Sequence, residues 1–151
     1  MATKCSILIV NFNGGSFIRN CLQSIKSSQC SCDIEVIIVD NQSNDNSLDV
    51  LSEYKNDCIV IQNLDNSGFS RGTNIAASFA SGDVLFLLNN DTVLKKDTIE
   101  KCIESLERDQ SIGALSPKLL NEDGSLQSPG SILGSWRFRS KKKIEVPFIA
   151  G

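Results

Sequence analysis

The sequence predicts an α/β fold, a three-layer α/β/α sandwich around a mainly parallel sheet. Three observations support this prediction. Apolar strand-like segments alternate with amphipathic helical ones, their connections are short, and the fourth apolar segment, 84–88, is an uninterrupted run. Alternation of this kind is typical of parallel strands joined by crossover helices. An unbroken apolar run indicates a strand buried on both faces of such a sheet. The length of 151 residues predicts one domain, 1–151, or a part of one.

Each element is predicted from its local pattern. Apolar runs at 6–10, 34–39, 59–61 and 84–88 predict four strands, and 113–115 predicts a fifth. Ser16 is expected to cap a helix that carries Ile18, Cys21, Leu22 and Ile25. A short helix carries Leu48, Leu51 and Tyr54, and a helix of small residues spans 73–80. Asp97 and Glu100 form a capping-box pattern before Ile99, Cys102, Ile103 and Leu106, and 121–124 reads as a hairpin-like turn.

Composition excludes several functions. The net charge of −3 and the pI near 4.9 argue against nucleic-acid binding through bulk charge. No apolar run approaches the roughly 18 residues of a membrane span, and the first residues do not resemble a signal peptide. We therefore expect a cytoplasmic location, with the inner face of the membrane as the alternative. Histidine is absent, so any chemistry must use carboxylates, amides and a bound cation.

The six cysteines are predicted to be structural thiols in a reducing compartment. Cys5 and Cys58 begin apolar strand segments, where a free cysteine behaves as a small hydrophobic residue. Cys21 and Cys102 fall on apolar faces of predicted helices. Residues 30 and 32 are both cysteines in a loop, and their spacing is not that of a zinc ribbon. We expect no disulfide, metal or redox site.

Polar turns follow all four of the first strands, at 11–15, 40–45, 63–74 and 89–91. One such turn alone is explained by ordinary turn chemistry. Four at one edge of a parallel sheet predict a polar cleft where a nucleotide can bind. Asp40 suits a base or ribose contact, and Gly72-Thr73-Asn74 at a predicted helix start favours an anion. The lone carboxylate of Asp91 suits a divalent cation shared with a diphosphate. No G-x-G-x-x-G or P-loop pattern occurs, which argues against a hydride-transfer site or an ATPase.

Four motifs carry a family resemblance. They are Val10-Asn11-Phe12-Asn13-Gly14, the segment 39–47, Asn66-Ser67-Gly68-Phe69-Ser70-Arg71-Gly72-Thr73-Asn74, and Leu88-Asn89-Asn90-Asp91. Together they resemble the inverting family 2 glycosyltransferases, which have a nucleotide-diphospho-sugar transferase (GT-A) type fold. The third motif, N-x-G-F-x-x-G-x-N, is similar to the rhamnosyltransferase-like branch, as are Ser116-Pro117-Lys118 and 123–127. The resemblance covers the donor-binding half of such a domain.

The resemblance implies a role for each matching residue. Asn11 and Asn13 would lie near the nucleoside, and Asp40 would contact the pyrimidine base of a UDP- or dTDP-sugar. The base, ribose and diphosphate pocket would be lined by Asn66, Gly68, Arg71, Gly72 and Asn74. Asn89-Asn90-Asp91 stands where the family has its D-x-D motif. Asp91 would therefore bind Mg²⁺ or Mn²⁺ when donor is present, and Asn89 would contact ribose or sugar.

The implied activity is sugar transfer with inversion to a glycan or lipid-linked acceptor, as in polysaccharide biosynthesis. The general base of the family lies in the second half of the domain, so the catalytic residue is expected beyond Gly151, and the chain is expected to be C-terminally truncated, with the acceptor half missing. Three acidic residues remain late in the sequence, Glu122, Asp123 and Glu145. Glu122 and Asp123 are predicted to lie in a solvated turn, and no base is assigned.

The last segment gives two further expectations. The apolar run 146–149 is expected to lack partners and to promote self-association. The basic stretch 137–143 is expected to be weakly ordered without ligand.

Two other functions stay open: a non-catalytic nucleotide-sugar-binding fragment, and another doubly wound module such as a receiver-like domain. Receiver-like domains cluster acids after the first strand, where this chain has Asn11 and Asn13.

Overall fold

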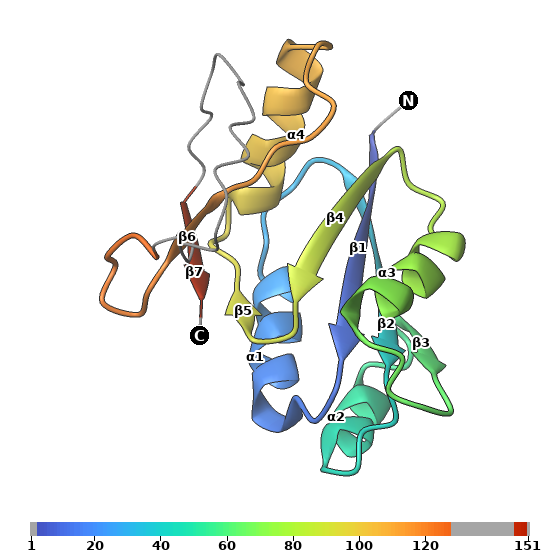
Figure 1. Ribbon diagram of the computed structural model, residues 1–151. Coiled ribbons are helices and arrows are strands. Elements are labelled where there is room, and N and C mark those ends of the chain that lie inside the picture. Colours follow the sequence, from blue (N-terminus) through green and yellow to red (C-terminus); the bar gives the residue numbers. More distant parts are fainter. Residues whose placement is uncertain (1–2, 128–146, 151) are drawn as a thin grey trace, which may run out of the picture.

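A parallel sheet in the order β3-β2-β1-β4 forms the centre of the fold (Figure 1). The computed structural model describes residues 3–127 and 147–150. Its elements are β1 (Lys4–Asn11), α1 (Gly15–Lys26), β2 (Asp33–Asp40), α2 (Ser47–Glu53), β3 (Ile59–Gln62), α3 (Phe69–Ser78), β4 (Val84–Asn89), β5 (Thr92–Val93), α4 (Thr98–Arg108), β6 (Lys118–Leu120) and β7 (Pro147–Ala150). The four predicted strands of the main sheet, and their parallel pairing, are confirmed.

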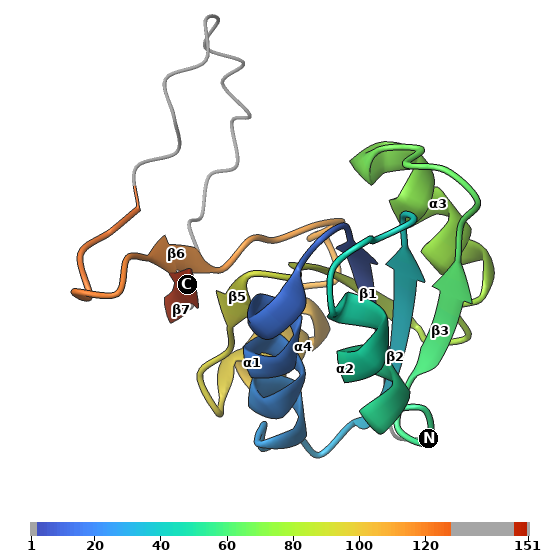
Figure 2. The same ribbon diagram turned by 90° about the horizontal axis from the view of Figure 1, so that it is seen from below.

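Helices cover both faces of this sheet, which confirms the predicted three layers. Alternate residues of β1 point to opposite faces. Ile7 and Ile9 pack in the larger core with residues of α1, α2 and α4, whereas Leu8 packs with Ala76 of α3 in the smaller one. Figure 2 shows α3 on one side of the sheet and α1 and α2 on the other. No helix of the described ranges is both long and apolar enough to span a membrane.

Strand β4 differs from its predicted environment. Leu85 and Leu87 are 49% and 55% exposed, so the expectation of burial on both faces is wrong. Within the described residues β4 pairs only with β1 and lies at the sheet edge. Helix α3 packs on β1 and β2 and leaves this part of the face open. An apolar run marks a strand in this sequence but does not distinguish a central strand from an edge strand.

The second half of the chain forms a small sheet of order β5-β7-β6. The predicted strand at 113–115 is wrong, because the strand begins at Lys118. β7 pairs in parallel with β6 and antiparallel with β5, so the expectation that 147–149 lacks partners is also wrong. Val146 and the basic stretch 137–143 lie outside the described residues. The predicted turn at 121–124 is confirmed by a hydrogen bond from the Gly124 N–H to the Asn121 carbonyl.

Three helix starts differ from prediction. Helix α1 begins after Gly14, without a side-chain cap from Ser16. Helix α3 begins at Phe69, four residues earlier than predicted, because Gly68 takes φ +80° and turns the chain into the helix. At α4 the capping box does not form; Glu100 instead accepts hydrogen bonds from Ser31.

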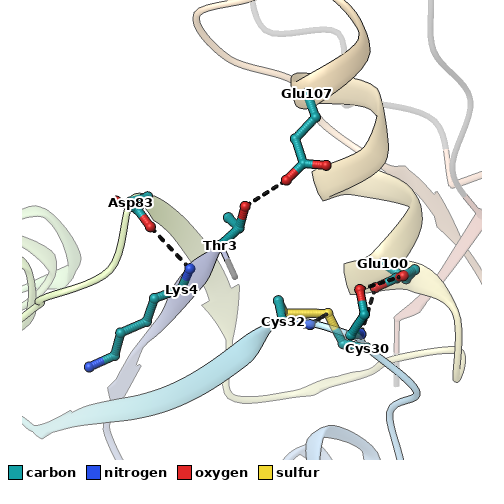
Figure 3. Close-up of a disulfide and its surroundings, with 8 residues drawn as sticks. Thr3, Lys4, Cys30, Cys32, Asp83, Glu100 and Glu107 are labelled. Carbon is teal, nitrogen blue, oxygen red and sulfur yellow. Dashed lines mark hydrogen bonds between the residues drawn. A yellow bond between two sulfur atoms is a disulfide. The ribbon is translucent and has the colours of Figure 1, made fainter. Parts of the chain in front are cut away.

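One prediction about cysteine is also wrong. Cys30 and Cys32, in the connection from α1 to β2, form a disulfide (Figure 3). The other four, Cys5, Cys21, Cys58 and Cys102, are free, as expected.

Self-association stays a prediction, and the exposed face of β4 now gives it a location. We expect the wild-type chain to associate as concentration rises, because paired exposed leucines on an edge strand favour association. Replacing Leu85 and Leu87 with lysine should reduce the association measured by sedimentation velocity. Leu64→Lys is the control, since Leu64 is 93% exposed on a loop. Equal effects of the loop and strand variants would contradict the location.

A carboxylate network around Glu35 lies near the amino-terminal ends of β1 and β2. This carboxylate accepts hydrogen bonds from the hydroxyl groups of Ser6 and Ser81 and from the Ser81 N–H, and it pairs with Lys4 Nζ at 3.0 Å. Burial raises the pKa of Glu35, but the hydrogen bonds from Ser6, Ser81 and Lys4 outweigh it and lower this pKa to about 2. The ionised form therefore ties β1, β2 and the segment before β4 together.

This pKa predicts an acid-dependent loss of stability. Because the pKa of Glu35 is lower in the folded chain, its ionised carboxylate stabilises the fold at pH values above the ordinary glutamate pKa near 4.5. This stabilisation is lost as the pH falls toward about 2. Glu35→Gln should flatten this part of the urea-unfolding profile, removing roughly 1–3 kcal/mol of its pH dependence. Glu53→Gln, at the exposed pair with Arg19, should change the profile much less. Identical profiles for wild type and Glu35→Gln would contradict the assignment.

Candidate nucleotide site at the carboxyl edge of the sheet

The first four strands end at one edge, as predicted. In register, Asn11 pairs with Asp40, Asp40 pairs with Gln62, and Val10 pairs with Asn89. The arrowheads of β1, β2, β3 and β4 accordingly lie at the same side of the sheet in Figure 1. The polar turns after these strands are therefore neighbours in space.

Asp40 lies beneath this edge, at the centre of a hydrogen-bond network. Its side chain is 1% exposed and that of Asn11 is fully buried. Asp40 Oδ1 accepts from Asn11 Nδ2 at 2.8 Å and from Ser43 Oγ at 2.6 Å, and Oδ2 accepts from the Ser43 N–H at 2.9 Å. Asn90 Nδ2 donates to Asn11 Oδ1 at 2.8 Å. In this arrangement the carboxylate joins the ends of β1, β2 and β4.

Asn41 forms a second centre beside the first and is also 1% exposed. Its Nδ2 donates to Asn66 Oδ1 at 3.3 Å and to the Gly68 carbonyl at 3.2 Å. Its Oδ1 accepts from Asn63 Nδ2 at 2.7 Å. Asn41 thus fixes the loop between β3 and α3. Gln42 follows with φ +60°, a left-handed conformation that turns the chain back so that Ser43 reaches Asp40.

The predicted site residues divide into buried and exposed groups. Asn11, Asp40 and Gly72 are buried; the exposed ones are Asn13, Asn66, Gly68, Arg71, Asn74, Asn89 and Asp91. The Asn13 N–H donates to Ser43 Oγ and its Oδ1 accepts from the Asn44 N–H, each at 2.9 Å. Asn66 Oδ1 accepts from the Gly68 N–H at 3.1 Å. Among the described hydrogen bonds, none links the side chain of Arg71, Asn74 or Asn89 to this network, and the Asn89 carbonyl accepts from Thr92 Oγ1 at 2.6 Å.

The two glycines of the third motif have different physical roles. A Cβ on Gly72 would lie 2.8 Å from Val10 Cγ1, so Gly72 allows α3 to approach β1 and lies inside that interface. It is not at a helix start, as the sequence suggested, but in the second turn of α3. Gly68 is exposed and provides the positive φ that begins the helix. The N–H groups that open α3 are those of Phe69, Ser70 and Arg71, and such groups favour an anion.

The fit of a divalent cation depends on Asp91. This exposed carboxylate lies in the turn between β4 and β5. Among the described residues no group of three or more Cys, Asp or Glu side chains is placed to hold a metal ion. A hard cation takes about six oxygen ligands, which waters and a diphosphate can supply beside one carboxylate. The donor set therefore fits a cation bound together with a ligand.

The late acids that the structure describes remain in a surface turn. Hydrogen bonds from Ser125 lower the pKa of Asp123, and the Ser125 N–H lies 2.8 Å from Asp123 Oδ1. Glu122 is exposed beside it. Glu145 lies outside the described residues.

Sequence reasoning gave no role to Asn41, Ser43 or Asn90, although each holds the network together. Asn41 and Ser43 follow the predicted strand 34–39 within four residues of its end, which was a usable signal. Nothing in the sequence alone indicates that these side chains bond to each other across loops.

Gly14 tests the network directly. A Cβ at this position would lie 2.1 Å from Asn11 Oδ1 and 2.5 Å from Asn90 Nδ2. We expect Gly14→Ala to break the Asn11–Asn90 hydrogen bond and to lower the free energy of unfolding by about 1–3 kcal/mol, the usual cost of overpacking. Urea denaturation measures this. Gly113→Ala is the matched control, because nothing lies within 4 Å of its added methyl. An unchanged free energy of unfolding in Gly14→Ala would show that the network is not tightly packed.

Comparisons with known proteins agree with this architecture. The family model described as Glycosyl transferase family 2 matches residues 6–147. The chain belongs to glycosyl transferase family 2. A chondroitin synthase of Pasteurella multocida strain Pm70 is 30% identical over 149 residues, covering 96% of this chain and 15% of that protein. The uncharacterized glycosyltransferase YfnE of Bacillus subtilis strain 168 is 31% identical over 111 residues, covering 72% of this chain and 28% of YfnE.

Solved structures of the family have the same fold. S. aureus TarS 1–349 in complex with UDP-GlcNAc matches with a TM-score of 0.73 and 25% identity, covering 80% of this chain and 36% of that chain. The predicted GT-A type fold is thereby confirmed. This family 2 chain spans between 15% and 36% of the length of these three proteins. The rhamnosyltransferase-like branch stays a prediction.

Proposed function

We propose that this chain forms the donor-binding part, 1–151, of a glycosyltransferase that uses a UDP- or dTDP-sugar. The main support is the carboxyl edge of the sheet, where a buried scaffold of Asp40 and Asn41 holds exposed amide and carboxylate side chains in a family 2 domain. The structural similarity to TarS in complex with UDP-GlcNAc supports the same class of ligand. The complete protein would transfer the sugar with inversion to a glycan or lipid-linked acceptor, as polysaccharide assembly requires.

The exposed residues suggest how the donor would be bound. Asn13 and Asn66 are exposed, and their Oδ1 atoms accept hydrogen bonds from the Asn44 and Gly68 N–H groups. Their Nδ2 groups would donate to a base or ribose. The N–H groups that open α3 and the exposed guanidinium of Arg71 would bind the diphosphate. Asn74 and Asn89 would extend the polar lining toward the sugar. Asp40 would act from beneath, by holding Asn11 and the Ser43 loop in position.

Asp91 would hold Mg²⁺ or Mn²⁺ against the diphosphate oxygens. A cation in this position neutralises the charge that develops on the leaving diphosphate. The Asp91 carboxylate would reach the cation without a movement of the core, because it is exposed in the turn between β4 and β5. The base that deprotonates the acceptor is not assigned to any residue of this chain.

Calorimetric titration of the chain with UDP, dTDP and ADP, each with Mn²⁺ or with chelator, tests the proposal. We expect the two pyrimidine nucleotides to bind more tightly than ADP, and Mn²⁺ to strengthen their binding. Absence of UDP and dTDP binding under all conditions would reject the donor site. A competition series with UDP-GlcNAc and dTDP-rhamnose would then identify the sugar, and a positive result for the latter alone would favour the rhamnosyltransferase-like branch.

Binding and transfer need separate measurements, because the chain spans only a part of its relatives. A chain that binds UDP but transfers no sugar would fit a nucleotide-sugar-binding fragment. Release of UDP from a UDP-sugar in the presence of an acceptor would show that the residues required for transfer are all present.

A further inference from the structure

We propose that the Cys30–Cys32 disulfide is a thiol–disulfide exchange site that accepts neutral or cationic thiols and, when reduced, releases the first turn of α4. The pair lies in the connection between α1 and β2 (Figure 3), just before β2 begins and therefore at the end of that strand opposite to its carboxyl end. It closes a ring across a single residue, Ser31. A loop this short removes little chain entropy from the unfolded state. General stabilisation of the fold therefore does not explain the bond.

Ser31, between the two cysteines, is what the disulfide holds in place. Its N–H and its hydroxyl group donate to the two carboxylate oxygens of Glu100, each at 2.9 Å. Glu100 lies in the first turn of α4, where a negative charge is favourable. The neighbouring Gln29 N–H donates to the Lys96 carbonyl at 2.7 Å, just before the same helix. The short ring thus fixes the orientation of the donors that dock α4 on the α1–β2 connection.

A hollow of about 210 Å³ beside Cys32 gives a small thiol access to the bond. It is lined by Thr3, Ser31, Cys32, Glu100, Ile103, Glu104 and Glu107. Three carboxylates and no Lys or Arg belong to this described lining, so an approaching anionic thiol is repelled and a cationic one is attracted. This charge distribution sets the class of reagent that the site accepts.

The other four cysteines are free thiols, which a thiol reagent does not reduce, and they are poor nucleophiles toward the Cys30–Cys32 disulfide. Cys5, Cys21 and Cys102 are buried, and Cys58 is half-buried, as both disulfide cysteines are. Burial raises the pKa of Cys21 to about 12 and the pKa values of Cys5, Cys58 and Cys102 to about 11. These thiols stay protonated near neutral pH, and a protonated thiol is a weak nucleophile.

The exchange needs two molecules of thiol. The first, as its thiolate, attacks Sγ of Cys32; a mixed disulfide forms there, the Cys30–Cys32 bond breaks, and Cys30 leaves as a thiolate. The second thiolate attacks the small-molecule sulfur of the mixed disulfide and releases Cys32. The protein disulfide is reduced to two thiols, which take up the two protons, and the reagent is oxidised to its own disulfide.

Alkylation with iodoacetamide followed by peptide mass spectrometry tests the bond itself. The untreated native chain should give a peptide with Cys30 and Cys32 unlabelled and linked, and thiol treatment should make both reactive while Cys5, Cys21 and Cys102 stay unlabelled. Full labelling of Cys30 and Cys32 before any thiol is added would overturn the proposal.

The rate of opening tests the charge preference. Cysteamine, which is cationic, should open the disulfide several-fold faster than thioglycolate, which is anionic, after correction for the thiolate fraction of each. High salt should reduce this ratio. Glu104→Gln should reduce it as well, whereas Glu122→Gln, the same change in an exposed turn remote in sequence, should not. Equal rates for the two reagents at low salt would overturn the proposed selectivity.

Hydrogen exchange of the amides in the first turn of α4 tests the consequence. Reduction should accelerate exchange at these amides in wild type. It should have little further effect in Glu100→Ala, which has already lost the Ser31 contact. Ser81→Ala serves as a control for folding, and reduction should act on it as on wild type. Unchanged exchange in α4 after reduction of wild type would show that the disulfide does not control this helix.

Discussion

Asp40→Ala is expected to lower the free energy of unfolding by about 3–5 kcal/mol, because three donors are left unsatisfied at roughly 1–3 kcal/mol each. The substitution leaves the Asn11 amide, the Ser43 hydroxyl and the Ser43 N–H without their acceptor. Each hydrogen bond to a charged group contributes about 1.5–3 kcal/mol. Urea denaturation monitored by circular dichroism measures the loss. Asp65→Ala is the matched control, an exposed aspartate at the same edge of the sheet.

The same variant should weaken nucleotide binding with or without metal. Asp40 holds the ends of β1, β2 and β4 in register with the exposed residues, and this requirement does not involve the cation. We expect UDP affinity to fall by about tenfold or more, equivalent to 1.4 kcal/mol. An Asp40→Ala chain as stable as Asp65→Ala would show that the buried network contributes nothing to the fold.

Asp91→Ala should have the opposite combination of effects. Its carboxylate is exposed in the turn between β4 and β5, so we expect the free energy of unfolding to change by less than about 0.5 kcal/mol. The gain in UDP affinity on adding Mn²⁺ should disappear completely, because the variant removes the one protein carboxylate proposed for the cation. In the proposed transfer reaction, turnover should fall further than affinity.

Calorimetry with UDP, run in Mn²⁺ and in chelator, separates the two variants. Asp91→Ala should match wild type in chelator and differ only in Mn²⁺, whereas Asp40→Ala should be weaker in both. Asp65→Ala is again the control, since it removes an exposed carboxylate at the same edge of the sheet that has no proposed role in binding. An Mn²⁺ effect that survives in Asp91→Ala would assign the cation to other ligands.

The sheet and its polar edge could be predicted because their signals are local. Apolar runs alternating with helical periodicity fix the order of strands and helices, and parallel strands must end at one edge. The exposure of Leu85 and Leu87 could not be predicted in this way. Whether a strand is central depends on which segment pairs with its far side, and the run 84–88 carries no information about that.

Local sequence patterns also did not predict the buried contacts of the site. Asp40 was expected to contact a base or ribose, because a carboxylate accepts hydrogen bonds from a ring N–H or a sugar hydroxyl. Its burial depends on three hydrogen bonds from two residues, Ser43 in the turn that follows it and Asn11 of β1, which is 29 residues away. The early start of α3 depends on the left-handed conformation of Gly68, and the Cys30–Cys32 bond depends on a loop geometry that spacing does not specify. These errors concern contacts and local backbone conformations, whereas the wrong strand at 113–115 concerns an element.

The adjacent positions of Asp40 and Asn41 also have a kinetic consequence. One side chain secures the loops after β1 and β4, and the next secures the loop between β3 and α3. Because both belong to one rigid strand end, these loops should fluctuate together as a single cooperative unit rather than one by one. Their backbone amides should show a shared opening free energy in native-state exchange. A donor that arrives at such a site meets loops that are already ordered, so association should proceed in one step, without a slow rearrangement after the encounter.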